Sequence, residues 1–149
     1  MNIKVEKQEK NIAIAYRFTT TRMKLAKSIN KIIIEISEYV KNNNGTIIGS
    51  PFVAYYNNEK QLDVAIGMLI KDKIEENDIY KIIDTNEGNA VTAIHEGSYI
   101  WLGRTYRKMT KYINDNKLTP INLAYEYYCN SPKAVKRKEL KTKVVLYIK

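Results

Sequence analysis

The sequence lacks the residues that build a disulfide-stapled or metal-centred fold. Its 149 residues include one cysteine, Cys129, and one histidine, His95. A single cysteine excludes an internal disulfide framework and is typical of a reducing compartment, so we expect a cytoplasmic protein. One histidine and one cysteine cannot supply the usual ligand spacing of a metal site, so no metal is expected.

Several functional segments are missing as well. The sequence shows no glycine-rich nucleotide-binding motif and no G-x-S-x-G nucleophile motif, so it indicates neither a nucleotide cofactor nor a serine hydrolase. No apolar stretch approaches the roughly 20 residues that span a bilayer, and no signal peptide is visible. We therefore expect one soluble domain over residues 1–149, without cofactor and without membrane contact.

Acidic residues are scarce in the last third of the chain. The net charge is +9, and residues 104–149 carry 12 Lys and Arg against three acidic residues, whereas residues 1–103 are balanced. A basic cluster can bind phosphate backbones, but the aromatic and glycine pattern of RNA-binding sheets is absent. A solvated loop and strand edge is the favoured interpretation, and a nucleic-acid partner is not expected. The densest cluster is Lys133, Lys136, Arg137, Lys138, Lys141 and Lys143.

Hydrophobic periodicity predicts the elements of the first half. A strand over residues 11–18 leads to threonines 19–21, which offer N-cap hydroxyls for a helix that starts at Arg22. Gly45 is the expected left-handed cap at its end. Strands over residues 51–56 and 62–70 follow. The predicted apolar helix stripe is Met23, Ala26, Ile29, Ile33, Ile36 and Val40.

The second half repeats this order after a charged connector at residues 71–88, in which a short strand can lie at 80–83. A strand at 90–95 and a turn at Gly97 and Ser98 come before a second helix. Strands at 123–129 and 141–148 complete the chain. The second helix stripe is Leu102, Tyr106, Met109 and Ile113.

The repeated order predicts an α+β fold made of a duplicated β-α-β-β unit, with halves at about residues 10–70 and 89–148. Such a duplication has pseudo-twofold symmetry and an antiparallel sheet with two long helices on one face. The groove between the helices is then the expected ligand site.

One charged residue stands within a predicted strand. Alternation places Ala124, Glu126 and Tyr128 on one face, and alignment of the two halves pairs Glu126 with Val53, which indicates an interior face. A buried carboxylate needs a partner or takes up a proton. A lysine or arginine, tyrosine hydroxyls, and a ligand cation over aromatic rings all remain open as partners. A register slip of one residue would expose Glu126 instead.

The order of several motifs resembles the GyrI-like family, which includes the effector-binding domain of AraC- and MerR-type multidrug-responsive regulators. The resembling segments are residues 94–99 (IHEGSY), residues 125–132 (YEYYCNSP), residues 49–52 (GSPF) and Asp63 through Gly67. The similarity covers about residues 10–148. Ala65, Lys143 and the final Tyr147-Ile148 depart from the family pattern.

The resemblance implies a ligand groove in which the residue matching Glu126 receives lipophilic cations, with Tyr99 and Tyr128 close by. Some family members are hydrolases of strained-ring toxins that use the same glutamate, and others act on DNA gyrase. We therefore expect a stand-alone protein that binds a lipophilic compound, which can be cationic. The candidate ligand-binding residues are Glu126, Tyr128, Tyr99, Trp101, Phe52, Tyr55, Met68 and Tyr16.

Two other functions remain open on the sequence. One is a hydrolase with Glu126 and Tyr99 as its catalytic residues. The other is an inhibitor that contacts a regulator, gyrase or nucleic acid, with steep salt dependence as the sign of phosphate contacts. We interpret His95 as a structural residue at a strand end and Cys129 as a core residue.

Overall fold

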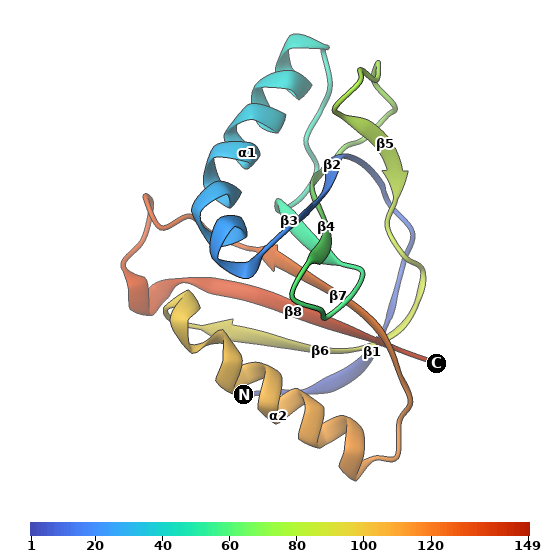
Figure 1. The fold of residues 1–149 in the computed structure, drawn as a ribbon, viewed down its shortest axis with the longest axis vertical. Helices are drawn as coiled ribbons and strands as arrows, with labels where there is room; N and C mark the ends of the chain where they lie inside the picture. Colours follow the sequence, from blue (N-terminus) through green and yellow to red (C-terminus); the bar gives the residue numbers. More distant parts are fainter. The chain divides into compact units, whose positions relative to one another are not determined.

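The computed structural model describes residues 1–149 and divides into two compact units. The first unit is Glu9–Asn86. The second unit is Met1–Gln8 together with Glu87–Lys149. Each unit contains antiparallel strands and one long helix (Figure 1), which confirms the predicted α+β class.

The strands of the first unit lie in the order β5-β2-β4-β3. The central strands β2 (Ile12–Thr20) and β4 (Leu62–Leu69) pair along most of their length, and β3 (Phe52–Tyr55) and β5 (Lys81–Asp84) flank them. Helix α1 (Arg22–Asn42) contacts β2 and β4. The predicted short strand within the connector corresponds to β5.

The ends of α1 combine one correct prediction with one wrong one. Thr21 is the N-cap, and its hydroxyl accepts a hydrogen bond of 3.3 Å from the backbone N–H of Lys24, as predicted. At the other end the left-handed residue is Asn44, with φ 57°, and not Gly45. Gly45 is needed for space instead, because a Cβ there would lie 2.8 Å from Cγ1 of Val40.

The apolar stripe of α1 also differs from its prediction. Leu25, Ile36 and Val40 are buried, whereas Met23 is 72% exposed and Ala26 is exposed as well. Each residue turns the helix by about 100°, so Met23 points away from the side on which Leu25 lies. The first turn of the stripe was therefore assigned to the wrong side of the helix.

The strands of the second unit lie in the order β1-β6-β8-β7. The central strands β6 (Gly88–Glu96) and β8 (Lys141–Ile148) pair with each other, and β1 (Lys4–Gln8) and β7 (Pro120–Tyr128) flank them. Strand β1 was not predicted, because its sequence, KVEKQ, is mostly charged and polar and its residues are largely exposed.

Helix α2 (Leu102–Asp115) lies along β6 (Figure 1) and follows a 3-10 turn at Tyr99–Trp101. A second 3-10 turn, Arg137–Glu139, lies in the exposed basic loop before β8. The predicted stripe of α2 is confirmed, since Met109 and Ile113 are buried and Leu102 and Tyr106 pack beside them. The sheet side of this core is formed by Val91, Ala93, Val144 and Ile148.

Neither α1 nor α2 combines the length and the apolar character that a membrane-crossing helix needs.

Gly67 provides a test of how tightly the first unit is packed, with Gly103 of the second unit as the comparison. A Cβ at Gly67 would lie 2.5 Å from Cζ of Phe52, so Gly67→Ala should lower the free energy of unfolding by about 1–3 kcal/mol through overpacking. Gly103 is in the first turn of α2, where the nearest atom to a Cβ is 3.6 Å away. Gly103→Ala should therefore raise stability by roughly 0.5–1 kcal/mol. Urea denaturation measures both changes, and an unchanged Gly67→Ala would show that the Phe52 ring moves freely.

Candidate functional site

Strand register places Glu126 on the face of the second unit that α2 covers. Glu126 pairs with Val144 of β8, and Val144 pairs with Ala93 of β6. Directly paired residues share a face, and Ala93 and Val144 pack against Met109 of α2. Tyr128, two residues further along β7, lies on the same face.

An irregularity in β7 sets how far along the sheet Glu126 lies. Pro120 pairs with Ile148 and Ala124 pairs with Leu146, so β7 contains two more residues than β8 between these pairs. Asn122 has φ 53° in this stretch, a conformation that asparagine tolerates better than most residues. Without the irregularity, continuous pairing would bring Glu126 opposite Thr142 instead of Val144.

The carboxylate of Glu126 is held by tyrosine hydroxyls. Glu126 is only 6% exposed. Its Oε1 accepts a hydrogen bond of 2.9 Å from the hydroxyl of Tyr128, and its Oε2 accepts one from the hydroxyl of Tyr106 on α2. Hydrogen bonds to a carboxylate are among the stronger ones in proteins. Of the partners left open by the sequence, the tyrosine hydroxyls are therefore present.

Tyr99 extends this arrangement by one ring. Its ring meets the ring of Tyr128 edge-on, with centroids 5.8 Å apart. Burial raises the pKa of Tyr99, and the negative charges of Cys129 and Glu126 raise it further. We call Tyr99, Tyr106, Glu126 and Tyr128 the tyrosine–glutamate cluster.

His95 fixes the turn that carries Tyr99. Its ring is 4% exposed, with Nε2 2.9 Å from the backbone oxygen of Ser98 and Nδ1 2.7 Å from Oγ1 of Thr105. A carbonyl oxygen only accepts, so Nε2 donates, and in the neutral ring Nδ1 accepts from Thr105. Gly97, with φ 110°, makes the tight turn that follows. His95 thus joins β6, the 3-10 turn and α2, which agrees with a structural role.

Trp101 is exposed and covered by a cation. Its side chain is 47% exposed, and the guanidinium of Arg104 lies 3.9 Å from the centre of its ring. The adjacent Ile100 is 75% exposed. Trp101 is therefore partly exposed, and its ligand-binding role stays a prediction.

The remaining candidates belong to the first unit, which separates them onto two faces. Register places Tyr16, Tyr55 and Met68 on one face of its sheet and Phe52 on the opposite face, over Gly67. Tyr16 stacks on Phe18, with ring centroids 4.5 Å apart. Phe52 and Tyr55 therefore cannot line the same surface of β3. The ligand-binding roles of these residues stay predictions.

Cys129 is exposed, so its assignment to the core is wrong. The predicted strand ran to residue 129, whereas β7 ends at Tyr128 and Cys129 lies where the chain leaves the sheet.

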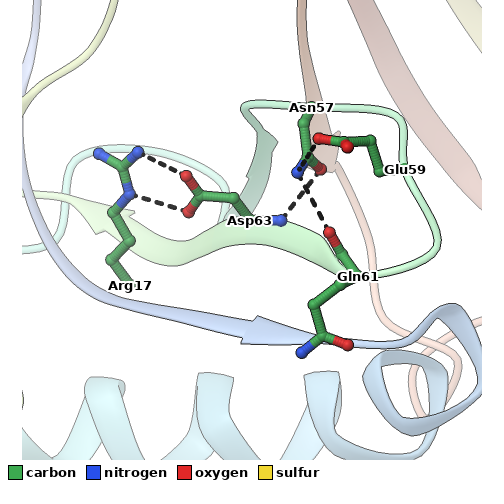
Figure 2. Close-up of polar contacts among 5 residues, drawn as sticks. All are labelled: Arg17, Asn57, Glu59, Gln61 and Asp63. Carbon is green, nitrogen blue, oxygen red and sulfur yellow. Dashed lines mark hydrogen bonds and ion pairs between the residues drawn. The ribbon is translucent and has the colours of Figure 1, made fainter.

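The segment that begins at Asp63 has a structural role. Asp63 accepts two hydrogen bonds, of 3.0 and 2.8 Å, from Arg17, and Arg17 holds the pKa of Asp63 below its usual value. Figure 2 shows that Asn57 closes the adjoining turn. Its Oδ1 accepts from the backbone N–H of Asp63, and its Nδ2 donates to the backbone oxygen of Gln61 and to Glu59. These contacts fix the β3–β4 connection.

A hollow of about 560 Å³ lies on the sheet face of the second unit that is turned away from α2. Its lining combines charged side chains, such as Lys4, Glu6 and Lys143, with apolar ones, such as Met1 and Ile94. Glu6 of β1 accepts a hydrogen bond from Thr92, which is the main reason that its pKa is lowered. The ammonium groups of Lys143 and Lys4 lie 3.7 and 3.8 Å from Glu6. Sequence reasoning missed this feature because it missed β1.

Sequence reasoning also missed the second role of Tyr106. Its place in the apolar stripe of α2 was correct, but its hydroxyl reaches Glu126. A tyrosine at a sheet-facing helix position, with a carboxylate predicted on the facing strand, is the signal that could have found this contact.

The bond between Tyr128 and Glu126 should appear as an energetic coupling. Tyr128→Phe removes a donor from a buried carboxylate and should lower the free energy of unfolding by about 1–3 kcal/mol. In a Glu126→Gln background the same change should cost less, with a coupling energy of about 0.5–3 kcal/mol in a double-mutant cycle by urea denaturation. Additive costs would show that the two side chains do not interact.

Tyr99 should titrate above its usual range, and its pKa should fall in Glu126→Gln because one negative charge is removed. Tyrosine ring-carbon NMR against pH, with Tyr99→Phe to assign the resonance, measures both effects. Since the folded-state pKa is raised, the stability that Tyr99 contributes is complete below the unfolded pKa of about 10. That contribution is lost as pH rises through the folded-state value. An unchanged pKa in Glu126→Gln would mean that the two groups are electrostatically independent.

Several solved structures have the same fold as this chain. The C-terminal domain of EcmrR superposes with a TM-score of 0.88 at 21% identity, covering 99% of this chain and 97% of that one. EcmrR in its complex with DNA gives 0.87 at 20% identity, where this chain spans 57% of the EcmrR chain.

Two further structures share the fold at lower similarity. SAV2435 bound to tetraphenylphosphonium gives a TM-score of 0.69 at 9% identity, covering 100% of this chain and 94% of that one. A hydrolase from Listeria innocua gives 0.64 at 12% identity, covering 99% and 91%. No sequence among the curated proteins matches the chain. The GyrI-like small molecule binding domain matches residues 1–149, and the chain therefore belongs to the GyrI-like family.

Proposed function

We propose that the tyrosine–glutamate cluster binds a lipophilic compound that can be cationic, with Glu126 as its anionic anchor. The observation that carries this proposal is a carboxylate that is 6% exposed and hydrogen-bonded by tyrosine hydroxyls. A hydroxyl donor stabilises a carboxylate without cancelling its charge, so the field of Glu126 can act on a bound cation.

The aromatic rings of the cluster favour the same class of ligand. A cation over a ring face gains about 0.5–2 kcal/mol, and the rings supply apolar contact area to the rest of the ligand. Membership of a small-molecule-binding family supports a small molecule as the ligand. The tetraphenylphosphonium bound to SAV2435 supports the choice of a lipophilic cation as probe.

Regulation of another macromolecule by ligand occupancy is the second part of the proposal. EcmrR, whose C-terminal domain has the same fold, is found in a complex with DNA. A regulator or gyrase as the protein partner of this chain stays a prediction that follows from the resemblance.

Hydrolysis of strained-ring electrophiles is less well supported by the geometry. Glu126 would take a proton from water while the water oxygen attacks a ring carbon, and a hydroxyl would protonate the oxygen that leaves. The raised pKa of Tyr99 makes it a weaker acid, which argues against Tyr99 as that proton donor.

Tetraphenylphosphonium binding, measured by isothermal titration calorimetry, tests the anchor. We expect the wild-type protein to bind this cation and Glu126→Gln to bind it at least about tenfold more weakly, because the anionic anchor is lost. Glu96→Gln is the matched control, since Glu96 is exposed and lines the hollow on the opposite face.

Comparison of the two variants shows which face of the sheet binds the cation. Equal affinity in wild type and Glu126→Gln would remove Glu126 as the anchor. A loss of affinity confined to Glu96→Gln would place the cation in the hollow on the opposite face and reject the proposed site.

A further inference from the structure

The hydroxyl of Thr142 has no hydrogen-bond partner although its side chain is completely buried. Thr142 is the second residue of β8 and pairs with His95 of β6 and Tyr128 of β7. It therefore lies on the face that α2 covers, in the row of side chains next to that of Glu126.

The neighbours of Thr142 use their polar groups elsewhere. Both ring nitrogens of His95 are engaged, with Ser98 and Thr105, and the hydroxyl of Tyr128 donates to Glu126. Buried hydroxyls are nearly always hydrogen-bonded, and an orphan is unfavourable for the free protein.

Other buried threonines in the second unit follow the usual rule. The hydroxyl of Thr92 donates to Glu6, and the hydroxyl of Thr105 bonds to His95. Valine has nearly the shape of threonine and suits a strand at least as well, and the next two residues on β8 that are fully buried, Val144 and Val145, are valines. Packing alone therefore does not account for a hydroxyl at position 142.

We propose that Oγ1 of Thr142 forms a hydrogen bond to the ligand that Glu126 anchors, an inference that rests on the proposed function. The ligand class is then narrower than lipophilic cations in general. It is a lipophilic cation that also carries a hydrogen-bonding group, such as a phenolic hydroxyl, and Thr142 is the residue that selects for this group.

The register supports a ligand that reaches both residues. Thr142 is directly opposite Tyr128, and it is diagonal to Glu126, a relation that corresponds to about 7–8 Å between Cα atoms. A ligand whose cationic centre meets Glu126 can therefore present a polar substituent to Thr142 across one phenyl ring.

The first test is the stability of the free protein. Thr142→Val removes an unpartnered buried hydroxyl and should raise the melting temperature by about 2–4 °C. The matched control is Thr92→Val, which removes a partnered hydroxyl on the opposite face of the same sheet and should lower the melting temperature. A fall for Thr142→Val of the same size as for Thr92→Val would show that the hydroxyl is satisfied in the free protein, and would overturn the proposal.

The second test compares two cations that differ by one hydroxyl, tetraphenylphosphonium and (4-hydroxyphenyl)triphenylphosphonium. We expect wild type to bind the hydroxylated cation about tenfold more tightly. Thr142→Val should remove this preference and leave the affinity for tetraphenylphosphonium unchanged, and Thr142→Ser should retain the preference.

The outcomes separate this inference from the proposed function. No hydroxyl preference in wild type, or the same preference in wild type and Thr142→Val, overturns the role of Thr142 while the anchor role of Glu126 stands. Failure of wild type to bind either cation overturns the proposed function, and the inference falls with it.

Discussion

A carboxylate that is kept inside the protein by hydroxyl donors is the constraint on which the second unit depends. Glu126 needs Tyr106 from α2 and Tyr128 from its own strand, so α2 must be held at the correct height over the sheet. His95 holds α2 in position, because its ring bonds both to Ser98 at the start of the 3-10 turn and to Thr105 of α2. The aliphatic core between α2 and the sheet supplies the burial, and the polar contacts decide the alignment.

Three carboxylates in the protein differ in the chemistry of their hydrogen-bonding and ionic partners. Asp63 is paired with Arg17, and Glu6 lies between Lys4 and Lys143, so cations already offset much of their charge. All three ion pairs are partly exposed, where ion pairs contribute little to stability. Glu126 is buried and its tyrosine partners are neutral donors. The GyrI-like chain thus contains carboxylates beside cations and a buried carboxylate that accepts hydrogen bonds from tyrosine hydroxyls.

The sequence predicted those features that depend on local periodicity. The stripe of α2 and the order of the main strands follow from spacing alone, and the interior face of β7 followed from alternation together with alignment of the two halves. Strand β1 escaped because a charged edge strand has no apolar pattern. Cys129 was misplaced because the predicted strand extended one residue beyond the end of β7. Alternation along the strand already places Phe52 and Tyr55 on opposite faces, although both were named as walls of one ligand site.

The contacts of Tyr106, His95 and Thr142 could not be predicted, because they depend on the register between segments that are distant in the sequence.

The irregularity around Asn122 has a consequence for how this site can change during evolution. Between the pairs Pro120–Ile148 and Ala124–Leu146, strand β7 contains two residues more than β8. The position of Glu126 along the sheet therefore depends on the length of this short stretch near the start of β7. Removal or addition of two residues there would translate Glu126 by about 6–7 Å along the sheet and keep it on the same face. A small insertion or deletion in this stretch would therefore shift the carboxylate along the sheet without any substitution at Glu126 itself.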